Sequence, residues 1–179
     1  FSKPVNLFLS RRLYQNASFS VVGGTDSRDE SVSLSSLFIE RPKSQIIISG
    51  QISYGDVLDA QISKLPEGNV LLRHSGEHDE GVIAMFAAGR AEFALLYPQQ
   101  VYDSDLKVNG RSYSISSVPP YILGHLMCTN NEVTKAFIQS VNDHLSDSDS
   151  LAELLKIHLQ YTNPIDKLVI ESYFSKEFN

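Results

Sequence analysis

The run Gln45-Ile46-Ile47-Ile48-Ser49, followed by the loop Gly50-Gln51-Ile52-Ser53-Tyr54-Gly55, decides the fold of this chain. A short run of β-branched residues is typical of a strand that is buried on both faces. Apolar residues then recur at helical spacing between positions 57 and 65, and Pro66-Glu67-Gly68 ends that helix. The stretch therefore predicts a buried strand, a loop and a helix in succession.

The same order repeats further along the chain. Residues 69–73 predict a second strand, and residues 77–89 predict a helix with Gly89 at its C-terminal end. Residues 93–97 predict a third strand, which Pro98 ends. Strands that alternate with helices through short connections predict an α/β fold, with a parallel sheet, right-handed crossovers and helices on both faces.

The flanking segments carry weaker patterns. Residues 1–22 favour extended structure, and residues 34–39 fit either a short helix or a strand. The C-terminal flank predicts a strand at 121–128, a helix capped by Asn130, a helix at 151–159 and a last helix from Asn163-Pro164. We predict one complete lobe at residues 23–98. Residues 1–22 and 99–179 are assigned to the crossing strands and to part of a second lobe.

Composition excludes several classes of protein. The 179 residues include 15 Lys and Arg against 21 Asp and Glu, a net charge of −6, which argues against a nucleic-acid partner. No apolar run approaches the roughly 18–20 residues that span a bilayer, so direct membrane insertion is not expected. The lone Cys128 excludes an internal disulfide, and its apolar surroundings favour a buried, inert thiol. Residue 1 is Phe rather than Met, which indicates a processed, excised or truncated chain.

The loop 50–55 is the best candidate for a site. Ligands of parallel sheets lie beyond the carboxyl ends of the strands, and a helix N-terminus there favours carboxylates and phosphates. Gln51, Ser53 and Tyr54 can add hydrogen bonds, and Tyr97 and Gln99 end the third strand on the same rim. The alternatives are a plain turn with Ser53 as the helix N-cap, and a Tyr97 that only packs against its neighbour.

Metal binding and catalysis find little support in the sequence. His74 and His78 are four residues apart, but Gly76 lies between them and no HExxH motif is present, so a solvated helix start is favoured over a metal site. No GxSxG motif occurs, and His125 and His158 lie among apolar residues as core histidines do. We therefore expect no catalytic residue, no metal and no cofactor.

Several segments, in order, resemble motifs of one family. These are Phe1-Ser2-Lys3-Pro4, Ser49-Gly50-Gln51-Ile52-Ser53-Tyr54-Gly55, Ala88-Gly89-Arg90-Ala91-Glu92-Phe93-Ala94, and Leu123-Gly124-His125-Leu126-Met127-Cys128 with the helix at 137–145. They are similar to the opening segment, the second-lobe ligand loop, the helix-to-strand step and the return strand of bacterial extracellular solute-binding proteins. That family (family 3-like) has the type 2 periplasmic-binding-protein fold. The likeness is closer to an uncharacterised proteobacterial branch.

The resemblance implies two α/β lobes that are joined by two crossing strands and close on a solute by a hinge. It implies a periplasmic protein that passes a small-molecule solute to an ABC importer permease or a sensor kinase. The chain starts where the family is already a third to a half of the way through, so the N-terminal part of lobe 1 is expected to be lacking.

The resemblance also suggests roles for residues of the cleft. It places Gln51, Ile52, Ser53 and Tyr54 in the ligand loop, and Arg11 or Arg12 at the cleft rim, where relatives grip a carboxylate. The family's acid for an α-amino group falls at Tyr97, which does not favour an α-amino-acid ligand. The expected function is non-catalytic binding of a polar or anionic solute for uptake. The alternatives are the sensing domain of a receptor, or a periplasmic dehydratase-like enzyme on the same scaffold.

Overall fold

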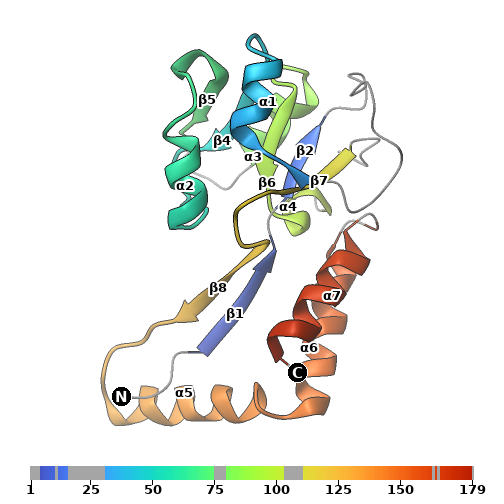
Figure 1. The fold of residues 1–179 in the computed structure, drawn as a ribbon. Helices are drawn as coiled ribbons and strands as arrows, with labels where there is room; N and C mark the ends of the chain where they lie inside the picture. The colour runs from blue at the N-terminus through green and yellow to red at the C-terminus, as the bar shows by residue number, and fades with distance from the viewer. Residues whose placement is uncertain are drawn as a thin grey trace.

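The computed structural model describes residues 5–10, 12–15, 31–74, 80–102, 111–162, 164 and 166–178. Within them, a six-stranded sheet with helices on both faces lies beside a two-stranded ribbon and three C-terminal helices (Figure 1). The strands of the sheet, in spatial order, are β3 (Ser31–Val32), β7 (Arg111–Ile115), β2 (Arg12–Gln15), β6 (Phe93–Leu96), β4 (Ile46–Ser49) and β5 (Val70–Arg73).

The predicted parallel unit forms one half of this sheet. β4 lies between β5 and β6 and runs parallel to both. Helix α2 (Asp56–Ile62) and the short 3₁₀ helix Glu67–Asn69 connect β4 to β5, and α3 (Glu80–Ala87) precedes β6. The succession of strand, helix, strand, helix and strand is therefore confirmed.

The sheet is wider than residues 23–98. β2 pairs antiparallel with both β6 and β7, and β7 pairs parallel with β3. Both β2 and β7 come from the flanks that the sequence assigned elsewhere. They belong to the sheet because they carry buried side chains to it, including Leu13 and Tyr14, which are both fully buried. The division of the chain into two lobes stays a prediction.

Side chains of the sheet alternate between two apolar layers. Ile46 and Ile48 pack in one layer with α1 (Leu34–Glu40) and α2, and Ile47 packs in the other with α3 and α4 (Pro98–Tyr102). The β-branched run that opened the sequence argument is therefore buried on both faces, as predicted.

The alternative left open at residues 34–39 is resolved in favour of helix α1. Ser33 adopts an extended backbone conformation and its side-chain oxygen accepts a hydrogen bond from the Ser36 N–H at 3.4 Å. This N-cap satisfies a donor that the first helical turn leaves unpaired, and Leu34 is fully buried behind it.

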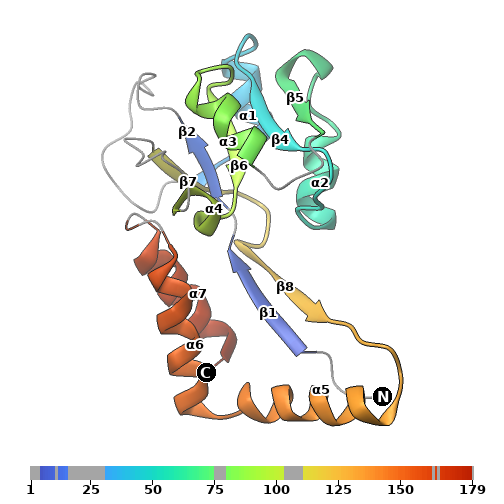
Figure 2. The same cartoon turned by 180° about the vertical axis from the view of Figure 1, so that it is seen from behind.

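The ribbon consists of β1 (Val5–Ser10) and β8 (Tyr121–Leu126), paired antiparallel. It extends away from the sheet, α5 (Glu132–His144) crosses its far end, and α6 (Ser148–Gln160) and α7 (Lys167–Phe178) return towards the sheet (Figures 1 and 2). Asn131 caps α5, one residue later than predicted. The predicted strand and three helices of the C-terminal flank are present, but the strand ends at Leu126 and the last helix begins at Lys167.

Two predictions about this end of the molecule are wrong. Cys128 is exposed rather than buried, because β8 ends at Leu126 and the chain then leaves the ribbon for α5. His125 is exposed as well. The predicted features at residues 1–4, 23–27 and 75–79, and the residues Arg11 and Asn163, lie outside the described residues. Among the residues that are described, no helix is both long enough and apolar enough to cross a membrane.

Candidate functional site

The parallel strands β4, β5 and β6 end at one edge of the sheet. Ser49 of β4 pairs with Arg73 of β5, and the Gly50 N–H donates to the Arg73 carbonyl oxygen at 3.0 Å. The residues that follow the three strands are therefore Gly50, His74 and Tyr97. Since ligands of α/β sheets lie beyond the carboxyl ends of parallel strands, this edge is where a solute would bind.

The loop 50–55 is closed by a carboxylate of its own chain. Asp59 accepts hydrogen bonds from the Ser53 hydroxyl at 2.6 Å and from the Tyr54 N–H at 2.9 Å. The N-cap residue of α2 is Gly55, with a φ of 89°, and not Ser53. Asp59 thus takes the place where an external anion would meet these donors. The sequence pattern did not point to Asp59, although an acid in the first turn of a helix is a signal of this kind.

Tyr54 and Tyr97 lie together at the edge. Their rings stack with centroids 6.2 Å apart and an interplanar angle of 28°. Tyr54 is buried, and its hydroxyl accepts from the Ser49 N–H at 3.1 Å and donates to the Leu95 carbonyl at 3.3 Å. Tyr97 is half-buried, and its N–H donates to the Gln100 side chain at 2.7 Å. The inner tyrosine is therefore anchored in the core, and the outer one rests on it.

His74 borders the loop on the other side, against Gly50. A Cβ atom on Gly50 would lie 2.5 Å from Cε1 and 2.6 Å from Nδ1 of the imidazole. The imidazole therefore lies over Gly50 in the space that a Cβ atom would take, and a larger residue there would displace the exposed ring. The sequence pattern drew attention to His74 as a possible metal ligand, but its place beside the loop 50–55 depends on the register of β4 and β5.

The other predicted residues lie at the same edge. Gln51 and Ser53 are exposed, and Ile52 packs its side chain against the apolar layer under the loop. Arg12 pairs with Leu96 in the sheet, which places its backbone next to the residue before Tyr97, while its side chain lies outside what the structure describes. The role of each residue in binding stays a prediction.

Gln99 points away from this edge. Its Nε2 lies 2.7 Å from Nε2 of His158 on α6, and its Oε1 is buried without a hydrogen-bond partner. The amide N–H donates, so the imidazole accepts through Nε2 in its neutral form. Burial lowers the pKa of His158 below its ordinary value. The pair joins the sheet to the C-terminal helices and does not line the loop.

Within the described residues, a metal-ligand cluster or a hollow away from the loop could mark a second site. The described residues contain no group of three or more His, Cys, Asp or Glu that could hold a metal ion, and His78 lies outside them. A hollow of about 230 Å³ lies between α5 and α6, at the opposite end of the molecule, and is lined by His144, Leu145, Ser150, Glu153, Leu154 and Ile157.

Neither protein-family models nor curated proteins match this sequence. Among solved structures, it is similar to the probable amino-acid ABC transporter extracellular-binding protein YtmK from Bacillus subtilis, with a TM-score of 0.53 and 12% identity. The alignment covers 90% of this chain and 62% of that one.

Two further solved structures are more distant. The C-terminal domain of a probable LysR family transcriptional regulator from Rhodococcus sp. RHA1 has a TM-score of 0.46 and 17% identity, over 78% of this chain and 66% of that one. A mutant of ArgBP from T. maritima has a TM-score of 0.42 and 15% identity, over 98% and 61%. The chain thus spans less than two thirds of the length of each neighbour. The mixed sheet with helices on both faces and the likeness to YtmK show that the chain has a periplasmic-binding-protein-like α/β fold.

Proposed function

We propose that this chain binds a small polar solute, without catalysis, at the carboxyl edge of β4, β5 and β6. The observation that carries the proposal is the stacked pair Tyr54 and Tyr97 beside the glycine-bounded loop 50–55. A ring anchored from behind, next to an exposed Gln51 and Ser53, offers one flat apolar surface and several polar groups, which is the usual composition of a small-molecule site.

The hydrogen bonds of Asp59 help to decide which class of solute the loop would bind. A carboxylate already accepts from the Ser53 hydroxyl and the Tyr54 N–H, so an anionic ligand group at this loop would meet a like charge. A neutral or donor-rich group would instead be attracted. Of the two ligand classes that the sequence suggested, polar and anionic, we therefore favour the polar one.

The proposal extends to the setting of the protein. The resemblance in sequence and the name of YtmK, an extracellular-binding protein of an amino-acid ABC transporter, support a periplasmic protein that delivers its solute to an importer permease. We propose that the β1–β8 ribbon supplies the crossing strands, that α5, α6 and α7 form part of a second, incomplete lobe, and that the protein belongs to the proteobacterial branch. The exposed apolar side chains of α5 support an incomplete second lobe.

A thermal-unfolding screen tests the proposal. The panel holds amino acids, dicarboxylates, polyamines, small peptides and sugars, each at millimolar concentration. A ligand at 100 times its Kd adds about 2.7 kcal/mol, which raises Tm by roughly 5–10 °C for a chain of this size. We expect neutral or cationic solutes to stabilise the protein and dicarboxylates to leave Tm unchanged.

Two matched variants test where the solute binds. Tyr97→Ala should abolish the ligand-dependent shift, whereas Tyr102→Ala should keep it, because the Tyr102 ring contacts Tyr161 and not the loop. A shift that survives Tyr97→Ala contradicts the proposed position of the site. No shift with any solute class contradicts the binding function itself.

A further inference from the structure

A buried carboxylate joins the C-terminal helices to the sheet. Asp166, directly before α7, is fully buried and accepts hydrogen bonds from the Tyr14 hydroxyl at 2.5 Å and the Ser112 hydroxyl at 2.8 Å. Tyr14 and Ser112 lie directly opposite each other on β2 and β7. The two hydroxyls, on adjacent strands, therefore donate to one carboxylate. In the sequence, Tyr14 is 152 residues and Ser112 is 54 residues away from Asp166.

The other end of α7 is joined to the ribbon. Glu177 accepts a hydrogen bond from the Tyr121 hydroxyl at 2.6 Å, and the rings of Tyr121 and Tyr173 lie 5.9 Å apart. Tyr121 is the first residue of β8. Helix α7 thus starts near the sheet and extends away from it on one side of the ribbon (Figures 1 and 2), and its last turn contacts the first residue of β8.

The ribbon itself offers little resistance to bending. In the described residues, β1 and β8 form a sheet of two strands only, and such a pair is marginally stable without support. The ribbon meets the six-stranded sheet where β1 passes into β2 and where β7 passes into β8. Connections of this kind are where domain hinges absorb a change of angle.

We propose that Asp166, Tyr14 and Ser112 form a latch that sets the angle between the six-stranded sheet and the β1–β8 ribbon. A rotation of the ribbon carries α5, which contacts β1, and with it the packed helices α6 and α7, so it pulls Asp166 away from Tyr14 and Ser112. Hydrogen bonds to a carboxylate in a buried setting are among the stronger ones, so the latch holds one angle until they break together. This inference goes beyond the proposed function and does not depend on a ligand.

Hydrogen exchange of the 179-residue chain, followed by mass spectrometry, tests the latch. Tyr14→Phe and Ser112→Ala each remove one donor and leave the carboxylate buried, so each should speed exchange in α7 by about 10-fold or more. Exchange in β4 and β6 should stay within a factor of two. The double variant should speed exchange in α7 further.

The control is Tyr113→Phe. Tyr113 is also buried, and its hydroxyl donates to the Gln15 side chain at 3.1 Å, but both residues lie within the sheet. This variant should leave exchange in α7 unchanged. Faster exchange in α7 for Tyr113→Phe, or unchanged exchange in α7 for both latch variants, would overturn the proposal.

A third variant, Asp166→Asn, tests whether loss of these hydrogen bonds acts on α7 alone or destabilises the whole protein. The amide keeps the size of the side chain and one acceptor oxygen, and it removes the charge that strengthens both hydrogen bonds. Its exchange in α7 should lie between those of the wild type and the double variant. Uniformly faster exchange throughout the sheet and α7 would show that Asp166 supports the whole fold and would overturn its role as a latch.

Discussion

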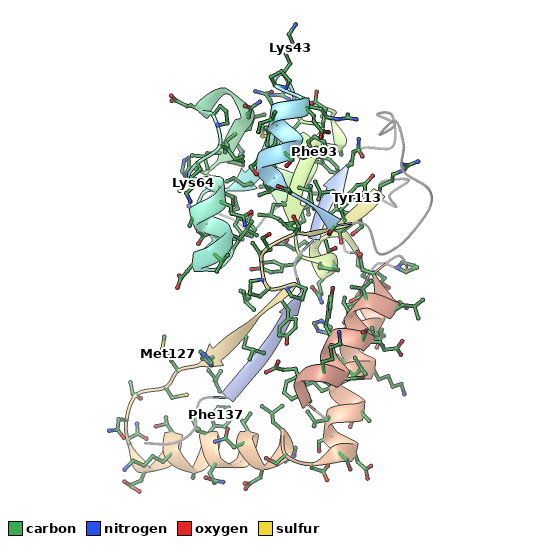
Figure 3. The ribbon with its side chains drawn as sticks, viewed as in Figure 1. Lys43, Lys64, Phe93, Tyr113, Met127 and Phe137 are labelled. Atoms are coloured by element: carbon green, nitrogen blue, oxygen red, sulfur yellow. The ribbon has the colours of Figure 1, made fainter. Side chains whose placement is uncertain are left out.

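The six-stranded sheet and the far end of the molecule differ in how they are held together. The sheet has an apolar layer on each face, and Phe93 at its centre is 1% exposed. At the far end, α5 buries Ile138 alone, and α6 buries no residue, both helices being described in full. Figure 3 shows Phe93 and Tyr113 among the side chains of the sheet, and Met127 and Phe137 beside the ribbon and α5.

The two regions therefore differ in how many buried apolar contacts hold them. The candidate site rests on β4, β5 and β6, of which β4 and β6 are buried on both faces. The far end has a smaller apolar cluster, in which Ile170 and Phe174 of α7 pack with leucines of α6, together with helix caps and a few polar contacts to the sheet. Parts of a protein with few buried apolar contacts open at lower free energy than its core, and these are the parts that move in function.

Truncation of one phenylalanine in each region should show the largest effect. Phe93→Ala should lower the free energy of unfolding by about 3–5 kcal/mol, because the ring is buried and meets Phe38 edge-on at 6.1 Å. Phe137→Ala should cost less than about 1 kcal/mol, because its side chain is 51% exposed. Urea unfolding followed by circular dichroism measures both. Equal costs would mean that another surface covers α5 in solution.

A buried amide tests whether polar groups also stabilise the sheet. Asn69 is 4% exposed, and its Nδ2 donates to the Pro42 and Ser44 carbonyls at 2.9 and 2.7 Å. Asn69→Ala leaves both carbonyls without this donor and should cost about 1–3 kcal/mol in the same urea experiment.

The matched control for Asn69 is Gln45→Ala. The Gln45 amide donates to the Gly68 carbonyl at 3.1 Å, but this bond is exposed to water, which can replace it. The cost should therefore stay below about 0.5 kcal/mol. A Gln45 variant that is as unstable as the Asn69 variant would show that burial does not decide the cost.

Local pattern was sufficient to predict the packed half of the molecule. The run Ile46 to Ile48 and the strand that Pro98 ends are each buried on both faces, and such runs have few alternatives in an α/β chain. The family motifs predicted two crossing strands; β1 and β8 pair as a ribbon, and their role between two lobes stays a prediction. The positions of Gln51, Ser53, Tyr54 and Tyr97 at one edge also followed from the order of strands and loops.

Local sequence patterns could not predict which distant strands pair with one another. β2 and β7 join the sheet through partners about 80 and 100 residues away, as Arg12 with Leu96 and Tyr14 with Ser112 illustrate. The contact of Asp59 with its own loop was missed, because the loop's donors appeared open to an outside anion. Cys128 was expected to be buried because apolar neighbours were read as strand, although the strand ends two residues earlier.

Removal of the N-cap of α5 should have a smaller effect on stability, and a neighbouring asparagine provides the control. The Asn131 side chain accepts from the Thr134 N–H at 3.0 Å, and the reciprocal bond completes a capping box. Asn131→Ala should cost about 1 kcal/mol and speed exchange in the first turn of α5. Asn130→Ala, one position earlier and outside the box, should do neither. The reverse result would move the helix start to the position predicted from sequence.

The smallest expected effect is a pH dependence at the junction between the two regions. Burial lowers the pKa of His158 below its ordinary value of 6.5, so the unfolded chain takes up a proton more readily than the folded one. The folded state should therefore lose stability as the pH falls below about 6.5, and be unaffected by this group above it. Protonation also turns Nε2 into a donor that faces the donating amide of Gln99.

Urea midpoints at pH 7.5 and pH 5.0 measure this dependence. Other groups titrate in the same range, so the informative quantity is the loss between the two pH values in each variant. His158→Gln should lose less stability on acidification than the wild type, since it carries no proton to gain. His125→Gln should lose as much as the wild type, because His125 is exposed on the ribbon. An unchanged loss in His158→Gln would mean that the contact between α6 and the sheet does not respond to pH, and that acid acts elsewhere on the molecule.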